Sequence, residues 1–256
     1  MIAAGILIFL LICGVLNLFN TGFRRVFFSG GHNQETIGSQ VAQRKGCFNC
    51  HGDLGSGGVL NPGGTPIPSF QNAAFDQRMT SLDDLRAWIL DGGPSHSQEK
   101  NNGSIKMPAY RGKLTRGEVR YLMDFYIAIS GAVQPQEAIA KKGLEVAAEK
   151  GCFDCHGPGG RIDLPNPFSV TGFVPSWNGP DYGRLVQNEA ELRDWILDGG
   201  TSRIENNPMA QWFRSRQVIN MPAYRDHLTT DELDALVAYI QWLRDPSAPD
   251  HQPVFQ

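Results

Sequence analysis

The feature that most constrains this chain is a short cysteine and histidine motif that occurs twice. In each copy two residues separate two cysteines, and a histidine directly follows the second cysteine. The residues are Cys47, Cys50 and His51 in the first copy, and Cys152, Cys155 and His156 in the second. This spacing is typical of covalent attachment of c-type haem, in which each thiol bonds one vinyl group and the histidine binds the iron. The sequence therefore predicts two haem c groups, which the protein positions for redox chemistry.

A Cys-x-x-Cys pair has other known uses, as a zinc half-site, a disulfide or a thioredoxin-like redox pair. A zinc site would need a second pair of ligands for each motif, and a thioredoxin-like motif would need a βαβ pattern that the sequence does not show. The chain has five cysteines, and the fifth, Cys13, lies in an apolar segment. The histidine that follows both pairs favours haem attachment.

The two motifs belong to a longer internal repeat. Residues 85–93 recur as 192–200, and residues 107–111, which read Met-Pro-Ala-Tyr-Arg, recur as 221–225. The copies lie 105 residues apart at the cysteine motifs but 114 apart at the Met-Pro segments, so the second copy carries insertions, the larger of them between Gly200 and Met221. A period of this length predicts tandem domains rather than a solenoid. We expect domains over residues 31–133 and 134–246, followed by a tail over 247–256.

Each repeat is predicted to be a small helical domain. One helix should lead into each motif, a loop rich in glycine and proline should follow, and two more helices should complete the unit. The expected helices lie at about 36–45, from Ser81 to 92–93 and from Thr115 in the first repeat, and at 135–150, from near Asn188 to 199–200 and from Thr229 or Thr230 in the second. Serine, threonine and asparagine at the starts and glycine at the ends are the expected cap residues.

The sixth iron ligand is expected from the loop before each final helix, where Met107 and Met221 stand at equivalent positions. A methionine thioether is a neutral ligand that raises the reduction potential of haem iron. Two histidines are rival candidates for the sixth ligand. Three other methionines are interpreted as core residues. These are His96 and His227, and Met79, Met123 and Met209.

Two tryptophans and four arginines also recur between the repeats. Trp88 and Trp195 are interpreted as core residues against the haem edge, with a role in tunnelling or propionate binding left open. The arginines are either haem propionate partners or surface charges. They are Arg86 and Arg111 in the first repeat, and Arg193 and Arg225 in the second. His32 and His251 are interpreted as linker and tail residues.

The first 30 residues are expected to be a membrane anchor. Residues 2–19 are almost continuously apolar, a length close to the roughly 17–25 residues of a transmembrane helix. We prefer an uncleaved anchor to a signal peptide, because no charged region precedes the segment and no clear cleavage site follows it. A lipoprotein attachment at Cys13 is less favoured. Arg24 and Arg25 favour a cytoplasmic location for the residues that follow them. This opposes the expected location of the haem domains on the periplasmic face of the cytoplasmic membrane, which is implied by the resemblance to c-type cytochromes given below.

With these motifs the sequence resembles class I c-type cytochromes in tandem, over about residues 32–243. The resemblance rests on Cys-Phe-Asn-Cys-His with Met107-Pro108 and Cys-Phe-Asp-Cys-His with Met221-Pro222. It implies an all-α fold class: an N-terminal transmembrane helix followed by two tandem cytochrome c domains. It also implies two low-spin haems with histidine and methionine ligands, His51 and Met107 in one and His156 and Met221 in the other.

The resemblance implies electron transfer rather than catalysis. Membrane-anchored dihaem subunits of bc-type complexes, cbb3-type oxidases and alternative quinol-oxidising complexes are the expected setting. The second half of the chain is acidic, with 17 Asp and Glu against 11 Lys and Arg from residue 133 onwards. It is expected to attract a soluble cytochrome or copper protein, unless it is only a solvated surface. No nucleic acid partner is expected. The alternatives are a dihaem peroxidase, a thiosulfate-oxidising cytochrome, a haem-based sensor or a free membrane-tethered carrier.

Overall fold

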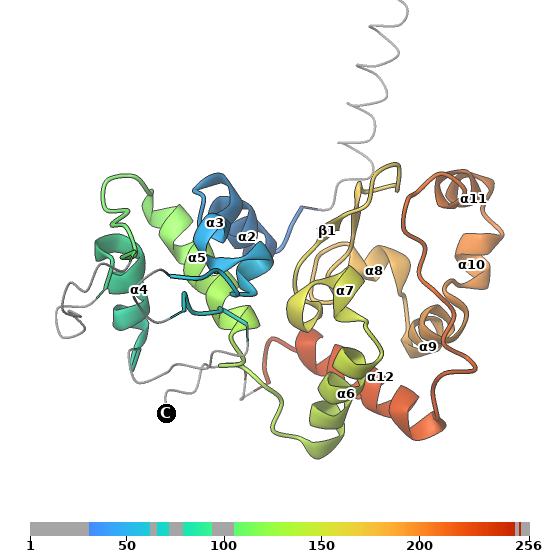
Figure 1. The fold of residues 1–256 in the computed structure, drawn as a ribbon. Coiled ribbons are helices and arrows are strands. Elements are labelled where there is room, and N and C mark those ends of the chain that lie inside the picture. The colour runs from blue at the N-terminus through green and yellow to red at the C-terminus, as the bar shows by residue number, and fades with distance from the viewer. Residues whose placement is uncertain (1–30, 62–65, 72–78, 94–104, 249–250, 252–256) are drawn as a thin grey trace, which may run out of the picture.

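The computed structural model describes residues 31–61, 66–71, 79–93, 105–248 and 251. They form two helical units side by side, here called the first unit (residues up to 133) and the second unit (134 onwards) (Figure 1). The elements of the first unit are α2 (Gln34–Arg44), α3 (Phe48–His51), η1 (Asp53–Gly55), α4 (Leu82–Asp91) and α5 (Arg116–Ile129). Those of the second are α6 (Ala138–Glu149), α7 (Phe153–His156), η3 (Pro158–Gly160), β1 (Leu164–Pro165), β2 (Phe173–Val174), α8 (Tyr182–Leu185), α9 (Glu189–Asp198), α10 (Ser202–Glu205), α11 (Pro208–Arg214) and α12 (Thr230–Arg244).

The helix termini follow the predicted caps. Ser81 and Asn188 accept hydrogen bonds from backbone N–H groups at the starts of α4 and α9. Thr115 and Thr229 each begin a complete capping box with the glutamate three residues later. The helices that lead into the motifs are slightly offset from the prediction, since they span Gln34–Arg44 and Ala138–Glu149.

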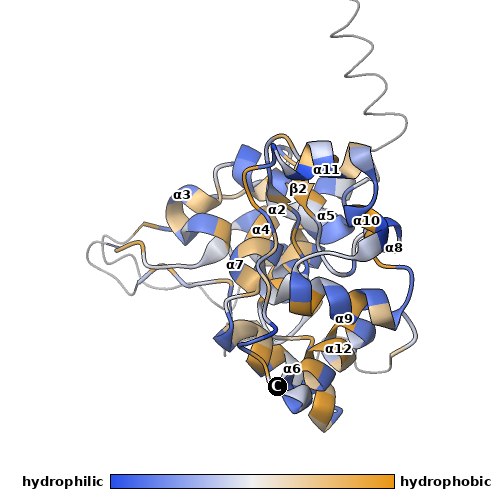
Figure 2. Ribbon diagram, turned by 90° about the vertical axis from the view of Figure 1, so that its right-hand side faces the viewer, coloured by the Kyte–Doolittle hydropathy of each residue, from blue (hydrophilic) through white to orange (hydrophobic). Residues whose placement is uncertain are grey.

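A pair of crossed helices forms the core of each unit, α2 with α5 and α6 with α12. Both crossings are close because a glycine lies at the contact. A Cβ atom added at Gly38 would overlap the carbonyl oxygen of Tyr121, and one added at Gly143 would overlap that of Ala235. Figure 2 shows hydrophobic and hydrophilic positions mixed around α6 and α12, as expected for helices with one buried face.

The second unit contributes to the core of the first. Ile162 is fully buried and packs in the same apolar cluster as Phe125 and Ile129 of α5. Polar contacts lie beside this cluster, where Asn33 donates hydrogen bonds to the carbonyl oxygen of Arg161 and to the side chain of Asn178. The two units are therefore joined along the segment that follows the second motif.

The predicted fold class needs correction on two points. The anchor expected over residues 1–30 lies outside the described residues, and among those described no helix is long and apolar enough to cross a membrane. The longest, α12, has 15 residues, whereas a span needs about 20. The predicted transmembrane helix, and the predicted single-pass location in the cytoplasmic membrane with the haem domains facing the periplasm, therefore gain no support from the described residues.

The second point is smaller, because the described chain is mainly helical as predicted and departs from an all-α fold only where β1 and β2 pair as a small antiparallel sheet with Leu164 opposite Val174. Strands of two residues are too short to leave an alternating pattern in the sequence. The insertion between Gly200 and Met221 was predicted only as extra length, and it contains α10 and α11. The tail is also partly structured, since the His251 ring lies 4.6 Å from that of Trp242, edge to face.

Candidate haem sites

The predicted site residues of the first unit line one cavity of about 560 Å³. Cys47, Cys50 and His51 reach it from the motif, and Met107 with its proline reaches it from the segment before α5. Apolar residues of α4 and α5 cover much of the remaining wall, and they include Leu85, Trp88, Ile89, Leu122, Phe125 and Tyr126. The cavity thus combines an apolar lining with two thiols, one imidazole and one thioether. This donor set fits haem c.

The imidazole of each motif is held in one orientation. The Nδ1 atom of His51 donates a hydrogen bond of 2.9 Å to the carbonyl oxygen of Pro68, and His156 makes the same bond of 2.9 Å to Pro175. Burial lowers the pKa of both histidines, although these hydrogen bonds oppose the shift. Both rings are therefore kept neutral with the proton on Nδ1, which leaves the Nε2 lone pair for a metal.

An aromatic ring lies beside each histidine. The rings of His51 and Phe70 have centroids 4.2 Å apart, and those of His156 and Trp177 are 5.0 Å apart. A glycine at positive φ allows each aromatic ring to approach, since a Cβ atom on Gly55 or Gly160 would overlap Phe70 or Trp177 respectively. The backbone N–H groups of Phe70 and Trp177 donate to the carbonyl oxygens of these glycines.

The sequence analysis overlooked these two aromatic residues. The signal was nevertheless present, because Pro68-Ser69-Phe70 recurs as Pro175-Ser176-Trp177, the same 107 residues apart as Trp88 and Trp195. The proline of each triplet supplies the carbonyl oxygen that orients the motif histidine, and the aromatic residue packs against the same imidazole. The triplets thus support the imidazoles from the segment that follows each motif.

The segments that contain Met107 and Met221 make the same backbone contact in the two units. Gly92 and Gly199 end α4 and α9 in the left-handed conformation, and a Cβ atom on either would overlap the backbone carbonyl of Met107 or Met221. Met221 packs against the core of the second unit, as does Cys152. The repeated glycine thus lets the Met-Pro segment pass close to a helix end.

A tyrosine connects each methionine segment to the helix before the motif. The hydroxyl of Tyr110 donates to the carbonyl oxygen of Lys45 at 3.1 Å, and that of Tyr224 donates to the carbonyl oxygen of Lys150 at 3.2 Å. Each lysine lies two residues before the first cysteine of its motif. The two sides of each candidate site are therefore linked within the protein.

The four motif cysteines are free thiols in the structure. Burial raises the pKa of Cys47, and it raises that of Cys152 to about 11. A buried, protonated thiol is a poor nucleophile, which does not fit a thioredoxin-like pair. A zinc site gains no support either, since the described residues contain no group of three or more histidine, cysteine or acidic side chains placed to hold a metal ion.

Several other predicted residues have protein partners of their own. Arg111 and Arg225 each form a bidentate ion pair with an aspartate, Asp91 and Asp198 respectively. Arg193 pairs with Glu189 and Asp234. Arg86 is exposed. The prediction of propionate binding by these arginines therefore gains no support from their contacts.

The two predicted tryptophans, Trp88 and Trp195, are both partly buried. Trp88 lines the cavity of the first unit, as expected for a residue at a haem edge. The indole N–H of Trp195 donates to the carbonyl oxygen of Leu185 at 2.9 Å. That bond leaves this N–H without a role in propionate binding, and Trp195 is only half-buried.

The remaining methionines and histidines complete the comparison with the sequence. Met79 and Met123 pack against the first core, as predicted, whereas Met209 is 54% exposed on α11, so its assignment to the core is wrong. His227 is exposed, which does not favour it as a rival ligand. His96 lies outside the described residues. His32 does not act as a simple linker residue, because its side chain contacts the second unit.

Comparison with known proteins bears on the second unit. Residues 140–244 match the family model described as cytochrome c. A relative is cytochrome c oxidase subunit 2 of Alkalihalophilus pseudofirmus, 29% identical over 111 residues, which are 43% of this chain and 28% of that protein. The chain thus spans little more than a quarter of this relative. A similar solved structure is the reducing HAO-like protein complex of Kuenenia stuttgartiensis, with a TM-score of 0.28 and 21% identity over 85% of this chain and 99% of that one. A likeness this distant supports no argument on fold or function.

Only one cytochrome c domain is recognised, so the prediction of two tandem cytochrome c domains is corrected. The first unit repeats the contacts around the motif but lacks α8, α10, α11 and the small sheet among its described residues. The recognised region contains the second motif and Met221. The chain therefore carries a cytochrome c domain over residues 140–244, and this domain implies covalently bound haem c with its iron.

Proposed function

We propose that this chain transfers electrons through two haem c groups, one in each unit. The observation that supports this proposal is the repetition of the whole site. Both units combine a Cys-x-x-Cys-His motif, an imidazole oriented by a proline carbonyl, and a Met-Pro segment packed against a terminal glycine. Haem c supplies reversible one-electron oxidation and reduction.

The residues of the chain have separate tasks in this proposal. Cys47 and Cys50 bind one haem covalently, and Cys152 and Cys155 bind the other. His51 and His156 each present Nε2 to an iron, since their Nδ1 atoms donate to backbone oxygens. Met107 and Met221 would each supply a second protein ligand to an iron. The apolar walls of the first cavity would limit the access of water to the haem there.

We further propose that the protein is a subunit of a multi-subunit respiratory or photosynthetic redox complex. The similarity to an oxidase subunit supports a complex partner in general. The candidates are a bc-type complex, a cbb3-type oxidase and an alternative quinol-oxidising complex, with a soluble cytochrome or copper protein as a second partner. Co-purification of tagged protein from native cells, followed by mass spectrometry, tests this part.

The number of haems is tested by the mass of the full chain, expressed in a host with a cytochrome c maturation system. We expect a mass increase of two haems, and of one haem when Cys47 and Cys50, or Cys152 and Cys155, are replaced by alanine. A mass increase of one haem in the unchanged chain would contradict the two-haem proposal.

The methionine ligands are tested by near-infrared absorption and carbon monoxide binding. We expect Met107→Ala and Met221→Ala each to remove about half of the methionine-to-iron band and to open one iron to carbon monoxide. Met209→Ala, at an exposed position on α11, is the matched control and should change neither signal. Carbon monoxide binding by the unchanged chain would favour a haem enzyme or sensor instead.

A further inference from the structure

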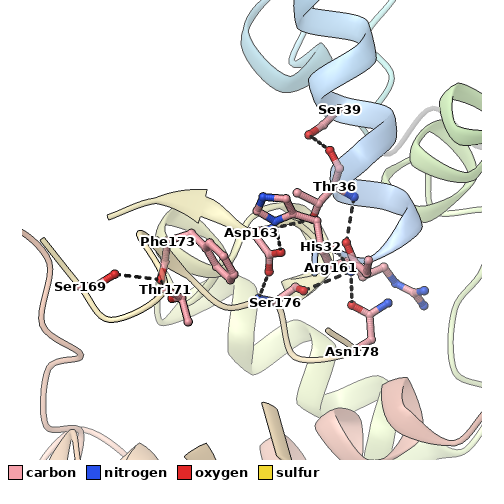
Figure 3. Close-up of polar contacts among 11 residues, drawn as sticks. His32, Thr36, Ser39, Arg161, Asp163, Ser169, Thr171, Phe173, Ser176 and Asn178 are labelled. Carbon is pink, nitrogen blue, oxygen red and sulfur yellow. Dashed lines mark hydrogen bonds and ion pairs between the residues drawn. The ribbon is translucent and has the colours of Figure 1, made fainter. Parts of the chain in front are cut away.

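A buried carboxylate lies where the two units meet. The side chain of Asp163 is only 2% exposed, and both of its oxygens accept hydrogen bonds. Oδ1 accepts from the backbone N–H of Ser176 at 2.6 Å, and Oδ2 lies 2.8 Å from Nδ1 of His32 (Figure 3). The backbone N–H of Asp163 donates to the hydroxyl of Thr36 in α2. Asp163 therefore contacts the start of the first unit and a loop of the second.

That loop is the one that supports His156. Ser176 directly follows Pro175, whose carbonyl oxygen accepts the hydrogen bond from the imidazole, and precedes Trp177, whose ring packs on that imidazole. Asp163 thus holds the middle residue of the triplet that orients His156.

Two basic side chains stand near Asp163 in the described part of the chain, Arg161 in the sequence and His32 in space. Arg161 is the nearest buried cation in sequence, but its guanidinium stacks on the ring of Trp242 at 5.4 Å and interacts with Glu35 and Tyr239. Glu35 in turn accepts a hydrogen bond from Asn178. His32, with a side chain 32% exposed, is the one titratable side chain that an ion pair places on Asp163 in the described part of the chain.

The described residues of the first unit include no acid at the matching position. Counted from the two motifs, the position equivalent to Asp163 is occupied by Gly58. A Cβ atom on Gly58 would have nothing within 4 Å, so no packed side chain replaces the carboxylate there. Counted in the same way, Arg161 corresponds to Ser56, so the buried carboxylate of Asp163 and the buried guanidinium of Arg161 both belong to the second unit alone. Of the two, the carboxylate is the one that is bonded to the segment that orients His156.

We propose that Asp163 is a positioning residue that lowers the reduction potential of the haem held by His156 relative to that held by His51. The physical reason is that an anion in a poorly solvated place stabilises the oxidised iron, which carries one more positive charge. The inference rests on the proposed two-haem function. It gives the two sites unequal potentials and so a preferred order of reduction, with the first unit reduced first.

The test is a spectroelectrochemical titration of the full-length holoprotein. Asp163→Asn should shift one midpoint potential upward and leave the other unchanged. Asp163→Glu retains the negative charge and should leave both midpoint potentials near those of the unchanged chain. The form with Cys152 and Cys155 replaced by alanine retains only the first site and identifies its potential. Asp194→Asn, which removes an exposed charge from α9, is the matched control and should shift neither potential.

Hydrogen exchange at the Ser176 amide provides a second measurement, because this amide donates to Asp163. It should exchange faster in Asp163→Asn and remain protected in Asp163→Glu. If Asp163→Asn does not fold, Asp163→Ser removes the same charge with a smaller side chain. Unchanged potentials in the neutral variants, or equal shifts at both haems, would overturn the inference. A mass of one haem in the unchanged chain would instead overturn the proposed function.

Discussion

The two units share the contacts nearest the candidate sites and differ in the parts farther away. Each has a glycine at its helix crossing, a proline carbonyl that orients the motif histidine, and a tyrosine that connects the methionine segment to the preceding helix. The second unit adds the small sheet, α10 and α11. The proline and tyrosine contacts hold segments that carry residues of the haem proposal, and the glycine contact holds the two core helices together. The repeat therefore preserves the core and the site, whereas the added elements change the outline of the second unit.

One difference does lie beside the site. The ring next to the motif histidine is a phenylalanine in the first unit and a tryptophan in the second, and each ring also packs edge-on against a tyrosine of the last helix. Phe70 packs on Tyr126, and Trp177 packs on Tyr239. The larger ring of the second unit stands directly after Ser176, whose amide Asp163 holds. The supports of the two imidazoles therefore share one arrangement and differ in the ring that each unit uses.

The largest expected effect comes from removing these rings. Trp177→Ala should lower the free energy of unfolding by about 3–5 kcal/mol, because a 7% exposed indole leaves a cavity behind. Phe70→Ala should have a somewhat smaller effect, since the phenylalanine is only half-buried. Urea unfolding followed by circular dichroism measures both changes.

Two further variants sharpen this comparison. Trp177→Phe gives the second unit the ring of the first and should cost less than Trp177→Ala. Trp212→Ala removes a tryptophan that is 51% exposed on α11, and it should change the stability by under about 1 kcal/mol. A loss at Trp212 equal to that at Trp177 would contradict a special role for the ring beside His156.

The helix crossings give the next largest effect. Gly143→Ala should destabilise the second unit by about 1–3 kcal/mol, and Gly38→Ala should do the same to the first, because each new methyl group meets a backbone carbonyl that cannot move aside easily. Gly117→Ala is the matched control. Its Cβ atom would lie 3.9 Å from the nearest side-chain atom, and alanine is the better helix former, so it should stabilise α5 by about 0.5–1 kcal/mol.

The sequence predicted the parts of the site that depend on nearby residues. The haem motif, the Met-Pro segments, the capping box of Thr115 and the left-handed Gly92 each depend on a few consecutive positions with a known physical preference. The close helix crossing at Gly38 instead depends on Tyr121, which is distant in sequence.

The remaining features depend on contacts between distant segments. The bond between His32 and Asp163 joins residues 131 positions apart, and no local pattern distinguishes such a histidine from one in a linker. Pro175 and Trp177 left a repeat signal, yet their function became visible only when the chain placed them against His156. Pair contacts of this kind carry no periodicity that a single sequence reveals.

A smaller effect is expected at the capping boxes. Thr229→Ala should destabilise α12 by about 1 kcal/mol. The backbone N–H of Glu232 loses its bond to the Thr229 hydroxyl, and the Glu232 carboxylate loses one of the two groups that hold it at the start of the helix. Thr115→Ala should cost α5 a similar amount, since the box is the same. Serine at either position keeps the hydroxyl and should restore most of the stability. Unequal losses would show that the two last helices contribute differently to their units.

The smallest effect concerns acid pH. The backbone of Thr229, followed by Lys150, lowers the pKa of Glu232 to about 2, from an ordinary value of 4.5. The unfolded chain therefore binds more protons than the folded one between these values, so this glutamate stabilises the fold above about pH 4.5 and loses its effect as the pH falls through about 2. The equivalent Glu118, next to Thr115 and Lys45, also has a lowered pKa.

The urea midpoint measured at neutral pH and at steps down to pH 2.5 tests this prediction. Glu232→Gln should lower the midpoint at neutral pH but have less effect at pH 2.5, where the unchanged chain has begun to lose the same interaction. Because the carboxylate is exposed, the difference should be small and should decrease further in high salt. Glu145→Gln, at an exposed position on α6, is the matched control. If Glu232→Gln had the same effect at both pH values, the loss would come from packing or capping geometry rather than from charge, and the acid sensitivity of the second unit would have another source.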